Sequence, residues 1–188
     1  MPLMELGDAV TRRRMVRSYD LHRPVPAALL NACLDAATRA PSAGFTQGWD
    51  FVVLDRPDDV ARFWELTTTG EPPDAWLAGM MTPPALVLCC SDPEAYLKRY
   101  SRPDKGWTDR DPARWPIPYW DVDTGMAAMV ALLTAVDLGL GACFFGVPTL
   151  RHTAVKDGFA IPDDRRIVGV ISLGYAARAT TRVKRSPS

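Results

Sequence analysis

An arginine-rich segment, Arg12 to Arg17, is the strongest grouping of charged side chains in the sequence for binding an anion. Four of its six residues are arginines. A guanidinium presents a planar fork of N–H donors that matches the oxygens of a phosphate group, so the segment predicts a phosphate site. The alternative is a solvated basic end of a helix, because cations are favoured near a helix C-terminus. Taken alone, the segment favours this simpler interpretation.

Two further segments could lie against a flat ligand. Residues 41–47, Pro-Ser-Ala-Gly-Phe-Thr-Gln, are mostly small or polar, and such residues let the backbone approach a ligand closely. Residues 139–146, Gly-Leu-Gly-Ala-Cys-Phe-Phe-Gly, follow a long apolar stretch. Each segment also has a purely structural explanation. The first would be a helix-to-strand connection, and the second a glycine helix stop followed by a core strand.

Several other kinds of site are not expected from this sequence. The two histidines, His22 and His152, lie far apart without ligand-like neighbours, so no metal site is expected. Four cysteines form no Cys-x-x-Cys pair and are interpreted as buried thiols in a reducing compartment. No Gly-x-Gly-x-x-Gly fingerprint of a Rossmann dinucleotide site is present. The sequence also shows no Ser-His-Asp or Cys-His arrangement and no paired carboxylates.

Composition points to one ordinary globular domain over residues 1–188, with 47% hydrophobic and 23% charged residues. The net charge is zero, whereas nucleic-acid binders usually carry a basic excess, so we expect no nucleic-acid partner. The N-terminus lacks a basic region followed by an apolar stretch, and the apolar segment 125–143 is interrupted by Asp137. We therefore expect no membrane partner and a cytoplasmic location.

Hydrophobic periodicity and turn residues predict the elements that would position these segments. Helices and strands are interspersed without strict alternation, which predicts an α+β or α/β layer protein. The predicted helices cover residues 3–13, 26–37, 57–66, 74–81, 92–100, 119–138 and 150–158, and the predicted strands cover residues 50–55, 85–90, 143–145 and 166–175.

Residues 101–118 differ from the rest of the chain. They contain four prolines and two tryptophans and show no periodicity, which predicts a long functional loop or lid, or else a mobile insertion. Four aromatic residues in or next to this loop, Trp107, Trp115, Tyr119 and Trp120, could form a cage for a planar electron acceptor. Equally, Trp115, Tyr119 and Trp120 could pack the core of a dimer.

In their order and spacing, these segments together resemble the nitroreductase superfamily of FMN enzymes. That family has an Arg-Arg-Ser-x-Arg segment near the N-terminus, then an Ala-Pro-Ser segment leading into a Phe-Val-Val strand. A long helix, a Gly-Leu-Gly turn and a Gly-Tyr strand end with basic residues follow. This sequence has a counterpart of each across nearly its whole length. The resemblance implies an α+β fold with a mostly antiparallel sheet flanked by helices, in an intertwined homodimer with FMN at the subunit interface.

The resemblance also implies roles for individual residues. The arginine-rich segment would contact the FMN phosphate and isoalloxazine, the Pro-Ser-Ala segment would reach the flavin of the other subunit, and the Phe-Gly pair would lie beside flavin N5. Basic residues of the tail would close on the phosphate. The implied cofactor-binding residues are Arg13, Arg14, Met15, Arg17, Pro41, Ser42, Ala43, Phe45, Gln47, Phe145, Gly146, Arg182, Lys184 and Arg185.

Some positions depart from the family pattern. Met15 replaces a serine, so only a backbone contact would remain there. Phe45 stands where an asparagine meets the flavin, and Gly48 where proline is usual. These changes would thin the polar contacts to the ring or give the pocket an aromatic wall. The C-terminus, at Ser188, is shorter than the arm of many relatives, which implies a weaker embrace of the partner subunit.

The function that the resemblance implies is hydride transfer from NAD(P)H through flavin N5 to an electrophilic acceptor such as a nitroaromatic or a quinone. The cofactor would supply the chemistry, so no catalytic triad is required. Arg13 or Arg14 would stabilise negative charge on the reduced ring. Two alternatives stay open at this point. The same fold serves dehydrogenases, dehalogenases and flavin-fragmenting enzymes. A non-enzymatic protein could instead only bind flavin, or could use the arginines for an acidic partner or a nucleic acid.

Overall fold

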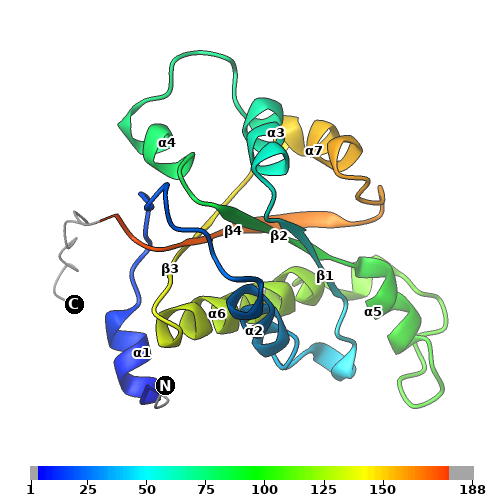
Figure 1. The fold of residues 1–188 in the computed structure, drawn as a ribbon. Coiled ribbons are helices and arrows are strands. Elements are labelled where there is room, and N and C mark those ends of the chain that lie inside the picture. Colours follow the sequence, from blue (N-terminus) through cyan, green and yellow to red (C-terminus); the bar gives the residue numbers. More distant parts are fainter. Residues whose placement is uncertain (1–3, 178–188) are drawn as a thin grey trace, which may run out of the picture.

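A four-stranded antiparallel sheet lies between two layers of helices in the computed structural model, which describes residues 4–177 (Figure 1). The strand order is β1-β2-β4-β3, and all three pairings are antiparallel. The strands are β1 (Trp49–Leu54), β2 (Ala85–Ser91), β3 (Gly141–Phe145) and β4 (Arg166–Gly174). The predicted α+β class with a mostly antiparallel sheet is confirmed, since the four strands pair antiparallel.

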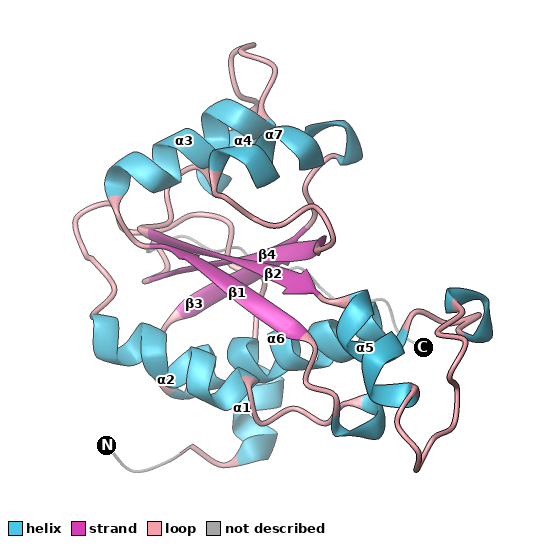
Figure 2. Cartoon of the chain, turned by 90° about the vertical axis from the view of Figure 1, so that its right-hand side faces the viewer, coloured by secondary structure: helices cyan, strands magenta, loops and turns pink. Residues whose placement is uncertain are grey.

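The helices cover the two faces of the sheet unequally (Figure 2). One face is covered by α1 (Leu6–Arg12), α2 (Ala27–Ala37) and α6 (Tyr119–Asp137), with α5 (Pro93–Tyr100) at the end of this layer. The other face is covered by α3 (Pro57–Thr67), α4 (Ala75–Met80) and α7 (His152–Gly158). Three short 3₁₀ turns complete the structure: η1 (Ala43–Phe45), η2 (Pro112–Arg114) and η3 (Thr149–Arg151).

Local sequence explains where the helices begin. Proline occupies the first turn of α3 and of α5, where its missing N–H costs nothing and its fixed φ suits the helix. Asp92 caps α5 by accepting a hydrogen bond from the backbone N–H of Ala95 at 3.0 Å, and Asp74 caps α4 in the same way. The predicted helices and strands are therefore confirmed, with ends that differ by a few residues at most.

Two hydrophobic cores follow from this layering. The alanine core lies between the sheet, α2 and α6, and much of it is formed by small side chains: Cys33, Ala37, Ala40, Ala85, Ala127, Ala128, Ala131, Ala135 and Ala142. The aromatic core lies between the sheet, α3, α4 and α7, and its members are larger: Leu54, Phe63, Trp64, Met80, Leu86, Leu88, Val155 and Val170. Strand β2 is buried along its whole length because both cores cover it.

None of the helices within residues 4–177 is both long and apolar enough to span a bilayer.

Candidate functional site

The arginine-rich segment leaves α1 and runs in extended form along the free edge of β3. Met15 pairs in parallel with Ala142, and the backbone N–H of Val16 donates to the carbonyl of Ala142 at 2.9 Å. Tyr19 then anchors the segment, since its buried hydroxyl lies 2.7 Å from the Ser172 hydroxyl of β4. The segment thus continues the sheet beyond β3, which fixes Arg17 between these two anchors and Arg13 and Arg14 just before the first.

Met15, which departs from the family pattern, takes part in this edge through its sulfur. The backbone N–H of Phe144 lies 3.5 Å from Met15 Sδ. The Met15 side chain also packs against both hydrophobic cores. Met15 therefore joins the segment to β3 by its side chain as well as by the backbone.

Two of the arginines direct positive charge toward the β3 residue Cys143. Burial raises the pKa of the Cys143 thiol, and the nearby charges of Arg17 and Arg13 oppose that rise. One guanidinium nitrogen of Arg13, Nη1, is buried and has no hydrogen-bond partner among the described residues. Within residues 4–177 neither Arg13 nor Arg17 forms an ion pair. A buried, unpaired cationic donor is costly, so Nη1 of Arg13 is prepared for an anion, and the exposed Arg17 adds a second positive charge nearby.

Arg14 has a different position. Its guanidinium donates to the carbonyls of Thr11 and Arg13, at 2.7 and 2.9 Å, and so caps the C-terminal end of α1. Arg12 pairs with Asp8 one turn earlier. The structure therefore separates the arginines into two that serve the helix end and two, Arg13 and Arg17, that lie near Cys143.

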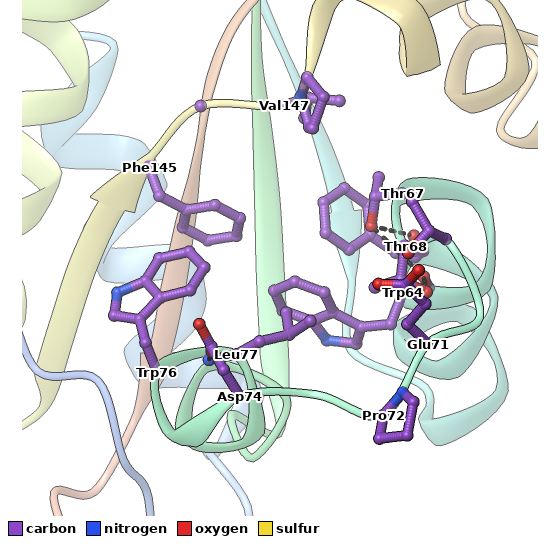
Figure 3. Close-up of a pocket in the computed structure, with 14 residues that line it drawn as sticks. Trp64, Thr67, Thr68, Glu71, Pro72, Asp74, Trp76, Leu77, Phe145 and Val147 are labelled. Carbon is purple, nitrogen blue, oxygen red and sulfur yellow. Dashed lines mark hydrogen bonds between the residues drawn. The ribbon is translucent and has the colours of Figure 1, made fainter.

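A cavity of about 410 Å³ opens between the aromatic core and the C-terminal end of β3 (Figure 3). Phe145 and Gly146, both implied by the family resemblance, form one wall. Trp64 from α3 stacks on Phe145 with ring centres 5.7 Å apart and planes inclined by 9°. Trp76 of α4 lies on the same side as Phe145 in the close-up. Flat apolar surfaces therefore dominate the inner part of this cavity, which suits a planar ligand.

The rim of the cavity carries polar groups. Thr67 and Thr68 donate their hydroxyl protons to carbonyls of α3, at 2.8 and 2.7 Å, so their oxygens keep lone pairs for a ligand. The side chains of Glu71 and Asp74 also line the cavity. Sequence reasoning did not identify this wall from α3 to α4. A possible signal was the pair of tryptophans, Trp64 and Trp76, flanking a Thr-rich and Pro-rich connection.

Helix α4 connects this cavity to the arginine-rich segment. Gly79 lies so close to the carbonyl oxygen of Arg17 that a Cβ atom at position 79 would clash with it. Only glycine allows this approach, which holds the C-terminal end of α4 beside the arginine-rich segment, one helical turn from Trp76. The cavity and the Arg13–Arg17 pair therefore belong to one region of the molecule.

The Pro41–Gln47 segment lies near the opposite edge of the sheet, where it leads into β1. Its backbone is held by the buried carboxylate of Asp123, which accepts from the Ala43 N–H at 2.8 Å and from the Tyr96 hydroxyl at 2.7 Å. The segment includes three residues with positive φ: Gly44, Phe45 and Gln47. This conformation leaves the Phe45 ring 76% exposed.

In a single chain these two predicted halves of a flavin site do not meet. Strands β1 and β3 are the two edges of the sheet, and three strand spacings of about 4.8 Å separate them by roughly 14 Å. The arginines lie beyond the β3 edge, whereas Pro41, Ser42, Ala43, Phe45 and Gln47 precede β1. One chain therefore supplies two separate surfaces.

The aromatic residues of the 101–118 loop form a packed cluster against α5 and α6. The Trp115 ring centre lies 5.4 Å from that of Trp107, 5.8 Å from Trp120 and 6.0 Å from Tyr119, with Tyr96 and Tyr100 completing the cluster. None of these rings lines the cavity beside β3. In one chain the four aromatics anchor the loop, and their contact with an acceptor stays a prediction.

Two further predictions concern the tail and metals. The basic tail residues Arg182, Lys184 and Arg185 lie outside the described residues. Within the described chain, no group of three or more His, Cys, Asp or Glu side chains is arranged to hold a metal ion.

Comparison with known proteins agrees with this geometry. Residues 10–175 match the model of the Nitroreductase family. A 4-nitrobenzoate reductase from Nocardioides sp. is 32% identical, over 97% of this chain and 88% of that protein. A Methanothermobacter thermautotrophicus protein, named as an NADH dehydrogenase or NAD(P)H nitroreductase, is 31% identical over 93% of this chain and 78% of that protein.

Solved structures show the same fold. A nitroreductase family protein from Streptococcus pneumoniae superposes with a TM-score of 0.75 at 19% identity, covering 97% of this chain and 96% of the other. A nitroreductase with bound FMN from Bacteroides fragilis gives 0.69 at 19% identity, covering 98% and 95%. The resemblance drawn from the sequence motifs is confirmed, and the chain belongs to the Nitroreductase family.

Proposed function

We propose that this oxidoreductase-family chain binds FMN, with the isoalloxazine in the cavity beside β3 and the phosphate held by Arg13 and Arg17. The observation that carries the proposal is the buried, unpartnered Nη1 of Arg13, located in the region of a cavity with flat apolar walls. An anionic group at this position would give the donor its missing partner. Phosphate suits it because charge-assisted bonds from guanidinium to phosphate are strong and directional.

The chain's own residues have defined parts in this proposal. Trp64 and Phe145 exclude water from the inner wall, which strengthens electrostatic interactions within the site. Thr67 and Thr68 offer hydroxyl oxygens at the rim. Arg13 and Arg17 hold positive charge near Cys143 of β3, where it would bind the phosphate. When bound, FMN supplies the hydride-transfer chemistry.

The working unit in this proposal is a homodimer. Helix α6 exposes four large apolar side chains at steps of three and four residues, Tyr119, Val122, Met126 and Met129. They form a continuous stripe on the face away from the alanine core, which is typical of an interface. Within one chain, the roughly 14 Å between β1 and β3 keeps the Pro41–Gln47 segment away from the arginines. A partner subunit would bring its own Pro41–Gln47 segment to them.

NAD(P)H is the proposed electron donor and a nitroaromatic compound or quinone the proposed acceptor. The names of two relatives support this, since one is a 4-nitrobenzoate reductase and the other carries the name NAD(P)H nitroreductase. The exposed, aromatic-walled mouth of the cavity, with Trp76 half-exposed, would admit a planar electrophile.

The test is anaerobic titration of the purified, FMN-loaded protein with NADH and NADPH, followed at the flavin absorbance band. We expect bleaching by at least one nicotinamide and recovery of the band on addition of 4-nitrobenzoate or a quinone. A protein that cannot be loaded with FMN contradicts the proposal. An FMN-loaded protein that neither nicotinamide reduces contradicts the donor assignment only.

Alanine variants separate the arginines. Arg13→Ala and Arg17→Ala should each weaken FMN binding by roughly 10- to 100-fold, because a hydrogen bond to a charged group contributes about 1.5–3 kcal/mol. Arg12→Ala is the matched control, since Arg12 pairs with Asp8 on an exposed surface, and it should change the dissociation constant less than threefold. Equal losses in all three variants would contradict the assignment.

A further inference from the structure

A second depression, which we call the basic groove, lies between η1 and α5 near the β1 edge of the sheet. Its volume is about 500 Å³, and its wall is formed by Gly44, Phe45 and Thr46 of the η1 segment and by Lys98, Arg99, Arg102 and Asp104 at the end of α5. The lining thus contains three cationic side chains and one carboxylate. The side chains that line the groove therefore carry a net charge of plus two.

The charges in the basic groove are only partly compensated within the chain. Both carboxylate oxygens of Asp104 accept hydrogen bonds from the Arg99 guanidinium, at 2.9 and 2.8 Å, which holds the pKa of Asp104 below its ordinary value. Asp104 is therefore committed to one partner. Within the part of the chain that the structure describes, Lys98 and Arg102 form no ion pair.

The acidic residue whose spacing along α5 would suit an ion pair with Lys98 has another partner. Glu94 lies four residues before Lys98 on α5, the favourable spacing for an ion pair, but it pairs with Arg110 of the loop. Lys98 and Arg102 both line the groove, and like charges in one depression repel each other. An anion in the groove would remove this repulsion.

The framework of the groove is held in place. Besides its two bonds to Asp104, Arg99 donates from Nε to the carbonyl of Gly44 at 2.8 Å, which joins the end of α5 to η1. Gly44 and Phe45 both have positive φ, and for a phenylalanine this backbone conformation is unfavourable. The strained backbone presents the exposed Phe45 ring at the edge of the cationic lining. An aromatic surface thus lies beside a cationic lining whose net charge would balance that of a dianion.

We infer that the basic groove binds the adenosine 2′-phosphate end of NADPH, with Lys98 and Arg102 contacting the phosphate and Phe45 stacking on the adenine. A net charge of two complements the dianion of the 2′-phosphate monoester, whereas NADH has an uncharged hydroxyl at this position. This inference rests on the proposed function, because the η1 segment reaches a flavin only across the proposed subunit interface. It assigns this chain a preference for NADPH over NADH.

The first experiment measures binding of adenosine nucleotides to the FMN-loaded protein by calorimetry. We expect 2′,5′-ADP to bind at least tenfold more tightly than 5′-AMP, which lacks the 2′-phosphate. The double variant K98Q/R102Q should lose about tenfold in affinity for 2′,5′-ADP, since each exposed charge contact contributes a few-fold. Its affinity for 5′-AMP should stay within twofold.

Lys105→Gln is the matched control for charge. Lys105 lies in the same stretch of chain, but it stacks over the Tyr100 ring and does not line the groove. This variant should bind both nucleotides like the unaltered protein. If Lys105→Gln weakened the binding of 2′,5′-ADP as much as K98Q/R102Q does, the effect would come from the lower overall charge of the protein. That result would contradict a specific site.

The second experiment measures flavin reduction by each nicotinamide. K98Q/R102Q should raise the KM for NADPH about tenfold, with kcat unchanged and the KM for NADH within twofold. Equal KM values for NADPH in the variant and the unaltered protein, together with equal binding of 2′,5′-ADP and 5′-AMP, would overturn the inference while leaving the proposed function intact. Failure of both nicotinamides to reduce the flavin would instead overturn the proposed donor, and the nucleotide binding would still test the groove.

Discussion

The two cores on either side of the sheet differ in the size of their side chains and in what they leave open. The alanine core contains eight alanines, and all of them except Ala40 are less than 4% exposed. It lies between the strands and the helices α2 and α6. The aromatic core contains Phe63, Trp64 and Met80, and next to it a cavity of about 410 Å³ remains. The core with small side chains is thus a closed layer, whereas the core with large side chains lies next to an open pocket.

This difference has a physical basis. Alanine brings helix and sheet backbones close and leaves little volume to fill, so the layer reaches the density of a protein interior. On the other side, rigid aromatic rings line the space between α3, α4 and the end of β3, and this space is left for a ligand. The alanine core therefore provides the scaffold, and the aromatic core provides the site.

The largest expected effect comes from enlarging a side chain in the alanine core. Ala131→Leu adds three carbon atoms at a position on α6 that is 1% exposed. We expect the free energy of unfolding, measured by urea denaturation, to fall by about 2–3 kcal/mol, because overpacking a dense core forces shifts of the backbone. Ala28→Leu on the exposed face of α2 is the control and should change stability by less than about 0.5 kcal/mol. A tolerated Ala131→Leu would show that the alanine core is loosely packed.

The matched change on the other side of the sheet tests the open pocket. Leu77→Phe enlarges a half-buried side chain that lines the cavity. The apoprotein should lose less than about 0.5 kcal/mol of stability, since the added atoms enter existing space. FMN binding, measured by fluorescence titration, should weaken at least tenfold because the ring occupies the proposed flavin space. Unchanged FMN affinity would place the flavin elsewhere.

The alanine core also predicts how stability changes in alkali. Burial raises the pKa of Cys33 on α2 to about 11, against 9 for an exposed thiol. The folded state then binds the thiol proton more tightly than the unfolded state, so stability is complete below about pH 9 and falls as the pH rises toward 11. Between pH 8 and pH 10 this one thiol should cost about 1.3 kcal/mol.

Cys33→Ala removes this titration. Urea denaturation of the variant at pH 8 and pH 10 should show a loss of stability about 1.3 kcal/mol smaller than in the unaltered protein. The comparison uses the change with pH, so any constant cost of the smaller side chain cancels. Parallel pH profiles in the two proteins would mean that the Cys33 thiol is more accessible to water than its burial indicates.

Sequence patterns predicted most of the fold because local signals agreed with tertiary packing. The apolar run at residues 85–90 predicted a strand buried on both faces, and β2 is covered by both cores. The glycine after residue 138 predicted the end of the long helix, and α6 ends at Asp137 with Gly139 at positive φ. Periodicity and glycine stops are local properties, so one sequence is enough to locate them.

The site was only partly predictable. The arginine-rich segment was identified, but the different positions of Arg14, which caps α1, and of Arg13, whose Nη1 is buried, depend on the turn that follows the helix. The cavity wall from Thr67 to Trp76 was missed, because it forms where a helix, a loop and a distant strand end meet. Such proximity arises from tertiary structure, and no local pattern contains it.

The smallest expected effect concerns the rim of the cavity. Asp74 caps α4, since its carboxylate accepts a hydrogen bond from the Leu77 N–H at 2.7 Å. Asp74→Ala should lower the free energy of unfolding by about 1 kcal/mol, the usual cost of losing a helix cap. Asp74→Ser keeps a capping oxygen and should recover most of this loss.

A second measurement on the same variants relates the cap to the site. Gly79 of α4 contacts the carbonyl of Arg17, so fraying of α4 in Asp74→Ala should also loosen the arginine-rich segment and weaken FMN binding slightly, by about two- to threefold. If Asp74→Ala lowers stability but leaves FMN affinity unchanged, α4 is only a cover on the aromatic core. If Asp74→Ser restores both quantities together, the helix that closes the open core also positions the cation beside it.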